Sequence, residues 1–244
     1  MRVAIVSDIH GNRTAFEAVL ADLRETSPDQ ICHGGDLADI GPNPAEIVDH
    51  IRDLGWLGVA GNGEEALVKP ETLEDFARQS SAPPSLWDAV RECIAGSRER
   101  LGEDRLNWMA GLPHIHVESA VALMHASPDS AWSSPRPEAN DTELNSVYGP
   151  LGAPVVVYGH IHRSFIRKVL TPQQTVMLVA NSGSVSLSYD GDPRAAYLVL
   201  DDATATIRRV QYDLDKELKQ LSTCGLPQAA WIARTLRTAS PQMP

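Results

Sequence analysis

The chain has 244 residues, a formal net charge of −11 and 43% hydrophobic residues, which is typical of a globular protein. Its acidity argues against binding to a nucleic-acid backbone, which normally requires a basic face. Small phosphorylated substrates remain compatible with it, because bound metal ions reverse the charge locally. No apolar run approaches the roughly 18 residues that cross a membrane, and three scattered cysteines without a CxxC pair predict free thiols and a cytoplasmic location.

The first quarter of the chain predicts alternating strands and helices. Residues 2–7 predict a strand, and residues 14–25 predict a helix whose apolar positions recur at helical spacing: Phe16, Val19, Leu20 and Leu23. A strand at 31–32, a helix at 44–54 and a strand at 57–60 follow, and Asn43-Pro44 begins the second helix. This βαβαβ order predicts a parallel sheet covered by helices.

The rest of the chain predicts first helices and then strands. Residues 64–112 are polar and predict two or three helices, and later strands are expected at 116–124, 154–158, 165–170, 176–180, 195–200 and 206–212. Short helices are expected near 142–147, 216–221 and 229–236. We therefore predict one domain over residues 1–244, with a helical insertion at 64–112 near the active site and short C-terminal helices within 214–238.

Side chains of metal-ligand type follow five of the expected strands. They are Asp8, His10, Asp36, Asn62, His125, His160 and His162. Two pairs are spaced i, i+2, which in extended backbone places both side chains on the same side. Taken singly, each residue also fits a helix cap, a turn or a core histidine, but their joint placement at strand ends predicts a metal site.

Five motifs resemble the calcineurin-like metallophosphoesterase family over about residues 1–212: Asp8-Ile9-His10, Gly35-Asp36, Gly61-Asn62, His125 and Gly159-His160-Ile161-His162. The family includes short bacterial phosphodiesterases and dinucleoside-polyphosphate hydrolases. The resemblance implies a four-layer α/β/β/α sandwich of two mixed β-sheets flanked by helices. It also implies two divalent metals, one bound by Asp8, His10 and His162, the other by Asn62, His125 and His160, with Asp36 bridging both.

The ligand set suits this implied chemistry. Oxygen and imidazole ligands without thiolate fit Mn²⁺, which we expect, and also Fe, Zn²⁺ or Mg²⁺. Two aspartates (−2) with two divalent ions (+4) leave a local charge of about +2, which attracts phosphate. The expected function is hydrolysis of phosphodiester, phosphomonoester or phosphoanhydride bonds of small substrates, nucleotides among them. The nucleophile is a hydroxide that bridges the metals and attacks in line, with Asp36 and Asn62 as catalytic residues.

Gly63 departs from the family, which mostly has a histidine after the asparagine to stabilise the phosphoryl group and help protonate the leaving group. General acid help is typically worth about 10²–10⁴-fold. Its loss favours a phosphoanhydride or activated ester as substrate, or a replacement acid, for which the candidates are Glu64, Glu65, His33, His114 and His116.

Asn12 and Arg163 flank the metal motifs and are expected to contact the substrate phosphate. Asn12 also fits a helix cap, and Arg163 a surface arginine.

An adapter is the alternative function. Some proteins of this fold, such as a retromer subunit, act mainly by binding partners, and Gly63 favours that role. The seven filled ligand positions favour an enzyme. A protein phosphatase is disfavoured, because the arginines that grip phosphate in such enzymes do not follow Asp36 or Asn62. The sequence predicts neither the physiological substrate nor the oligomeric state.

Overall fold

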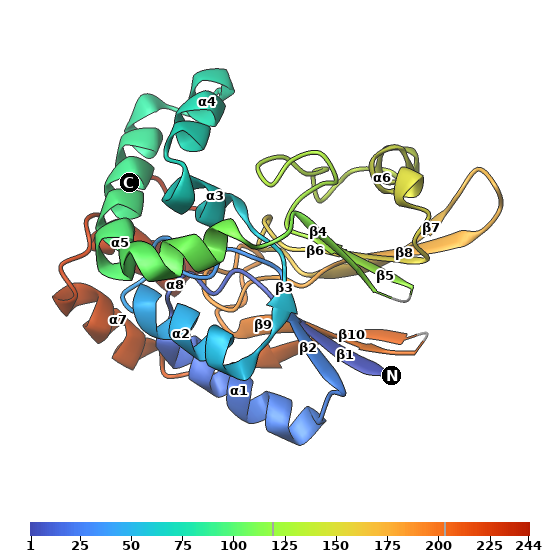
Figure 1. Cartoon of the computed structure of the whole chain (residues 1–244), viewed down its shortest axis with the longest axis horizontal. Coiled ribbons are helices and arrows are strands. Elements are labelled where there is room, and N and C mark those ends of the chain that lie inside the picture. The colour runs from blue at the N-terminus through green and yellow to red at the C-terminus, as the bar shows by residue number, and fades with distance from the viewer. Residues whose placement is uncertain (119, 203) are drawn as a thin grey trace.

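Two five-stranded mixed sheets form the centre of the computed structural model, which describes residues 1–118, 120–202 and 204–244 (Figure 1). The first sheet has the order β10-β9-β1-β2-β3, with strands Thr204–Val210, Ala195–Asp201, Arg2–Val6, Gln30–His33 and Leu57–Gly58. The second has the order β4-β5-β6-β8-β7, with strands Ile115–Glu118, Val121–Met124, Val155–Tyr158, Val176–Asn181 and Phe165–Leu170.

Each sheet is built around three parallel strands. In the first sheet β1, β2 and β3 are parallel, and in the second β5, β6 and β8 are parallel, while β9, β10, β4 and β7 pair antiparallel. Gly159, which follows β6, lies against Ser7, which follows β1. The carboxyl ends of both parallel sets therefore meet at one edge of the molecule, and that edge is where a site is expected.

Apolar layers on both faces of the sheets hold the sandwich together. Between the sheets, residues of both are buried against one another: Val3, Ile5, Cys32, Val59, Leu123, Val157, Ala180, Leu198 and Leu200. The outer face of the first sheet packs on α1 (Arg13–Thr26) and α2 (Pro44–Leu54), and that of the second on α6 (Asp141–Tyr148). This arrangement confirms the predicted four-layer sandwich.

The remaining helices lie at the end of the sheets where the strands' carboxyl ends meet. The predicted helical segment forms α3 (Asn62–Val68), α4 (Glu71–Gln79) and α5 (Pro84–Ala110), and α5 is interrupted at Gly102. The predicted C-terminal helices are α7 (Leu214–Thr223) and α8 (Ala229–Thr238), and a short 3₁₀ turn, Gly149–Leu151, follows α6. An apolar cluster joins α7 and α8 to Cys93 of α5, which fixes the C-terminal helices beside the helical segment.

The prediction of one strand over 116–124 was wrong. Two strands, β4 and β5, pair antiparallel there, with Ile115 opposite Met124 and Glu118 opposite Val121. Apolar residues recur at 115 and 117 in the first arm and run continuously over 121–124 in the second, so the hydrophobic pattern alone does not separate the two strands. Residue 119 itself lies outside the described residues. Among the helices of the described ranges, none combines the length and the apolar character that crossing a membrane requires.

Candidate metal centre

The loops after β1, β2, β3, β5 and β6 bring the seven predicted ligands to one edge of the sandwich. Five of these ligands have left-handed backbone, with φ of 57° at Asp8, 47° at His10, 52° at Asp36, 68° at His160 and 54° at His162. Our sequence argument from extended i, i+2 spacing was therefore wrong, although the side chains do converge. Such backbone costs about 1–3 kcal/mol per residue and concentrates at functional sites.

Four of the ligands form a compact buried group. The donor atoms of Asp8, His10, Asp36 and His162 all lie within 4.8 Å of one another. Nε2 of His162 lies 3.0 Å from Oδ1 of Asp8, and the Nε2 atoms of His10 and His162 are 3.1 Å apart. The other ring nitrogen of each histidine faces an acceptor, Asp39 Oδ1 at 2.6 Å for His10 and the Leu187 carbonyl at 2.6 Å for His162.

A second group adjoins the first through Asp36. Oδ1 of Asn62 lies 3.0 Å from Nε2 of His125 and 2.8 Å from Nδ1 of His160. Nε2 of His125 is also 3.4 Å from Oδ2 of Asp36. Nδ1 of His125 faces the carbonyl of Gly34 at 2.7 Å, so this nitrogen donates and Nε2 carries the lone pair. The structure thus brings together all seven predicted ligands.

The chemistry of these donors fits metal ions. When Nδ1 of His10 and of His162 each donates to its acceptor, the Nε2 atoms of both rings carry lone pairs. These lone pairs face each other and the Asp8 carboxylate, so only electron-pair donors line the space between them. Such a cluster needs a shared cation, and hydrogen bonds of this outer kind are the usual device for aiming imidazole lone pairs at a metal. The nitrogen and oxygen donors, without sulfur, suit Mn²⁺, Fe, Zn²⁺ or Mg²⁺.

The raised pKa values of two of these histidines also indicate a site for cations. Burial lowers the pKa of His10 and His125, but the nearby carboxylates, Asp39 for His10 and Asp36 for His125, outweigh it and raise these pKa values to about 9 and about 10. Burial also works against ionisation of Asp36, yet the charges of His125 and His10 hold its pKa below the usual range. At neutral pH, protons therefore take the lone pairs of His10 and His125 that metal ions would bind, so protons and metal compete for these two residues.

Backbone and buried side chains fix the two aspartates. Ser7 Oγ donates to Oδ2 of Asp8 at 2.5 Å, and the backbone N–H of His160 donates to Oδ1 at 3.1 Å. The N–H of Gly63 donates to Oδ1 of Asp36 at 2.7 Å. Each aspartate thus keeps a fixed orientation, with its remaining lone pairs turned toward the histidines.

A family model described as the calcineurin-like phosphoesterase superfamily domain matches residues 1–204. The chain belongs to this superfamily. A relative from Methanocaldococcus jannaschii, an uncharacterised protein, is 30% identical over 253 residues, which cover 96% of each chain. The symmetrical bis(5'-nucleosyl)-tetraphosphatase of Aromatoleum aromaticum is 25% identical over 151 residues, covering 60% of this chain and 52% of that enzyme.

Two solved structures show the same fold over nearly the whole chain. The metallophosphoesterase from Sphaerobacter thermophilus has a TM-score of 0.78 at 24% identity and covers 98% of this chain and 100% of its own. A hypothetical protein from Pyrococcus horikoshii has a TM-score of 0.82 at 15% identity and covers 99% of each. The family model thus makes the chain a calcineurin-like metallophosphoesterase, and the two solved structures share its fold.

In this phosphoesterase, position 63 has no room for a side chain. A Cβ built on Gly63 would lie 2.8 Å from Cγ of Asp39 and 2.9 Å from Oδ1 of Asp36. Both contacts are shorter than real Cβ atoms make, so one of the two carboxylates would have to move. The space is held by Asp39, the residue that accepts a hydrogen bond from Nδ1 of His10.

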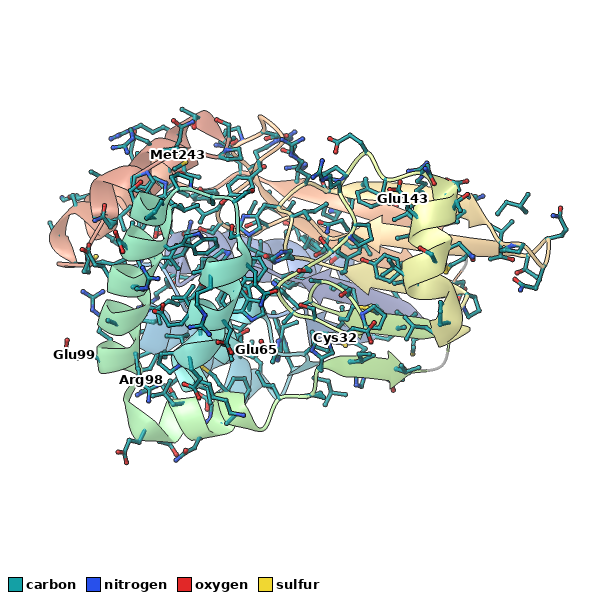
Figure 2. The ribbon with its side chains drawn as sticks, turned by 90° about the horizontal axis from the view of Figure 1, so that it is seen from above. Cys32, Glu65, Arg98, Glu99, Glu143 and Met243 are labelled. Carbon is teal, nitrogen blue, oxygen red and sulfur yellow. The ribbon has the colours of Figure 1, made fainter. Side chains whose placement is uncertain are left out.

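The five candidate replacement acids have other contacts. Glu64 is buried and accepts from the backbone N–H groups of Asp36, Leu37 and Gly61 at 2.7, 2.8 and 2.7 Å. Glu65 accepts from the indole N–H of Trp132 at 2.7 Å, which ties the loop after β5 to α3; Figure 2 shows that loop and α3 side by side over the strands, with Glu65 labelled.

The three histidines among the candidates are engaged as well. His33 is fully buried, with its ring against Gly58 and a ring-centroid distance of 6.2 Å to Trp108. Nε2 of His114 faces the Ser127 carbonyl at 3.0 Å, and His116 pairs with Glu118 on β4 at 3.4 Å. Among the described residues, none of these three histidines hydrogen-bonds to a predicted ligand.

The two predicted substrate-binding residues differ in their surroundings. Asn12 is 1% exposed, and its side chain accepts from the N–H of Ala15 at the start of α1 and donates to Ser186 at 3.2 Å. Both of its polar atoms are therefore used within the protein. Arg163 follows His162, its side chain is 45% exposed, and it lies 4.0 Å from Glu138. A contact between either residue and substrate stays a prediction.

One aromatic residue at the site was missed by the sequence analysis. Tyr189 stacks on His162 with ring centroids 4.5 Å apart and an interplanar angle of 28°, and its backbone N–H donates to the His162 carbonyl at 2.9 Å. Burial and the charges of Asp8, Asp39 and Asp36 raise the pKa of its hydroxyl above the usual range. Tyr189 lies in the loop after β8, and β8 is parallel to β6, which the His162 loop follows. Because loops after parallel strands lie at the same edge of a sheet, this strand order was the signal that could have placed Tyr189 near the ligands.

Proposed function

We propose that this protein is a dinuclear metal-dependent hydrolase of small phosphorylated substrates, with phosphoanhydrides and activated phosphoesters, nucleotides among them, as the preferred class. The observation that carries the proposal is the convergence of seven lone-pair donors at one edge of the sandwich, with Asp36 shared between the two groups. Two divalent cations held there would supply Lewis acidity and a nucleophile derived from water at neutral pH.

The residues of the chain have separate tasks in this mechanism. Asp8, His10 and His162 would hold one cation, Asn62, His125 and His160 would hold the other, and Asp36 would contribute to both. Asn62 is neutral, which leaves the site more positive toward an anionic substrate. Arg163, half exposed and next to His162 in the sequence, is expected to bind a phosphate oxygen of the substrate.

Two observations support anhydrides and activated esters as substrates. Gly63 offers no proton to a basic leaving group, so leaving groups that depart as stable anions react fastest. Relatives that are 24–26% identical over 60% of the chain carry the name of symmetrical bis(5'-nucleosyl)-tetraphosphatases, although this chain spans only about half of their length.

An adapter has no need for five strained ligand residues, since strain of this kind costs stability.

The test is hydrolysis by protein stripped of metal and reloaded with Mn²⁺. Its substrates are an aryl diester, an aryl monoester, an alkyl monoester and a dinucleoside tetraphosphate. Asp36→Asn keeps the shape of the side chain and removes the shared charge, and Asp104→Asn makes the same change at an exposed position on α5. We expect turnover of the aryl esters or the anhydride by wild type and Asp104→Asn, and none by Asp36→Asn. Equal turnover by Asp36→Asn and wild type would contradict the mechanism.

A further inference from the structure

The protein keeps the metal ligands of its family but has no side chain at position 63, so another group must contact the phosphoryl oxygens that the family histidine contacts. A side chain at 63 itself is excluded by the positions of Asp39 and Asp36. Glu64, Glu65, His33, His114 and His116 already have other partners or are enclosed. Arg163, which follows His162, is one remaining candidate, and the loop after β8 carries another.

Tyr189, in the loop after β8, has a polar side chain that contacts one of the predicted ligands. Its ring lies against His162, at 4.5 Å between centroids, and also packs on the apolar cluster that contains Cys93 of α5. The carboxylates that crowd position 63, Asp39 and Asp36, also act electrostatically on its hydroxyl. The residue is partly exposed, and within the described ranges its hydroxyl forms no hydrogen bond with the protein.

The loop that carries Tyr189 is anchored, so the ring is held in place before substrate arrives. Ser184 Oγ donates to the carbonyl of Asp8 at 2.8 Å, and the N–H of Ser186 donates to the same carbonyl at 3.2 Å. The Leu187 carbonyl faces Nδ1 of His162, and the N–H of Tyr189 closes the loop onto the His162 carbonyl. A preorganised donor of this kind is effective because little order is lost when it binds charge.

We propose that the Tyr189 hydroxyl donates a hydrogen bond to the phosphoryl group of the bound substrate, in the role left open by Gly63. The chemistry fits, because a neutral phenol is a donor that keeps its proton, and the phosphoryl oxygens carry the negative charge that such a donor stabilises. Stacking on His162 holds the ring of Tyr189 beside a predicted ligand, which restricts where its hydroxyl can lie. The inference rests on the proposed function.

The test uses Tyr189→Phe, which removes the hydroxyl and keeps the ring stacked on His162. Tyr197→Phe is the matched control, because its hydroxyl contacts Asp22 and Thr26 of α1, where that helix ends and away from the ligands. Inorganic phosphate is titrated calorimetrically into the Mn²⁺-loaded full chain, metal content is measured, and kcat and KM are determined with an aryl phosphate ester.

We expect Tyr189→Phe to bind phosphate about 10-fold more weakly and to lose about 10- to 100-fold in kcat/KM, as for a hydrogen bond to a charged group. Metal content and the Tyr197→Phe control should match wild type. Phosphate affinity and kcat/KM within twofold of wild type would overturn the proposal. Loss of metal from Tyr189→Phe would also overturn it, because the hydroxyl would then act on the metal ligands rather than on the substrate.

Failure of the proposed function gives a different result. Wild type would then bind phosphate in a metal-dependent way but hydrolyse none of the esters or anhydrides. In that case the phosphate titration alone decides the role of Tyr189, since weaker binding by Tyr189→Phe supports the contact and equal binding removes it.

Discussion

Replacing Gly63 by alanine tests whether the missing histidine reflects a lack of space. The new methyl group would lie 2.8 Å from Cγ of Asp39 and 2.9 Å from Oδ1 of Asp36. Glycine-to-alanine in a helix ordinarily stabilises by up to about 1 kcal/mol. Here overpacking costs about 1–3 kcal/mol, and displacement of Asp36 loses the bond from the Gly63 N–H, worth about 1 kcal/mol. The net expectation is a loss of about 2 kcal/mol.

Thermal unfolding of the metal-free protein measures this loss. For a chain of this size, about 2 kcal/mol lowers Tm by roughly 4–8 °C. Because Asp36 is shared by both ligand groups, Mn²⁺ affinity should fall at both positions in a calorimetric titration. In an Asp39→Ala background the closest contact is gone, so Gly63→Ala should cost less there. A Tm at or above that of wild type, with unchanged Mn²⁺ affinity, would refute the steric argument.

Three further predictions concern buried charged and polar groups. Asp39→Asn should lower Mn²⁺ affinity at the His10 position by about 10–100-fold in a chelator competition, because the hydrogen bond that aims His10 is weakened. Glu64→Gln should lower the free energy of unfolding, measured by urea denaturation, by about 1–3 kcal/mol, because one of the backbone N–H groups that Glu64 accepts from would then face an amide NH₂. The control Glu65→Gln should lower it by less. Burial, helped by the charge of His116, lowers the pKa of His33 to about 4. The unfolded chain therefore binds the extra proton between about pH 6.5 and 4, and stability falls as the pH falls through that window. From pH 7 to pH 5, wild type should lose about 2 kcal/mol more than His33→Leu; equal losses in urea unfolding would show that His33 is not the cause.

The ligand positions were predictable because each follows an apolar run that has to be a strand. Residues 3–6 and 156–158 are buried, and polar residues that follow them lie at the strand ends. The parallel order of the first strands placed those ends together. Pattern and topology were sufficient for the fold and for bringing the predicted ligands to one edge of the sandwich.

The backbone conformation and the neighbours of the ligands could not be predicted from the sequence pattern. Left-handed backbone at Asp8 and His160 depends on the loops around them, and no periodicity encodes it. Asp39 had the sequence context of an ordinary turn residue, yet it occupies the space beside Gly63 and contacts His10. Tyr189 lies about 180 residues from Asp8, in the loop after β8, and only packing against His162 shows its place.

The division of the ligands between the two sheets has a mechanical consequence. Asp8, His10, Asp36 and Asn62 come from loops of the first sheet, and His125, His160 and His162 come from loops of the second. Each predicted metal position draws on both, so a bound ion cross-links the two halves of the sandwich and closes a chain loop of more than a hundred residues. Chelation should therefore loosen both sheets together, and hydrogen exchange should quicken in β1 and β6 alike rather than in the loops alone.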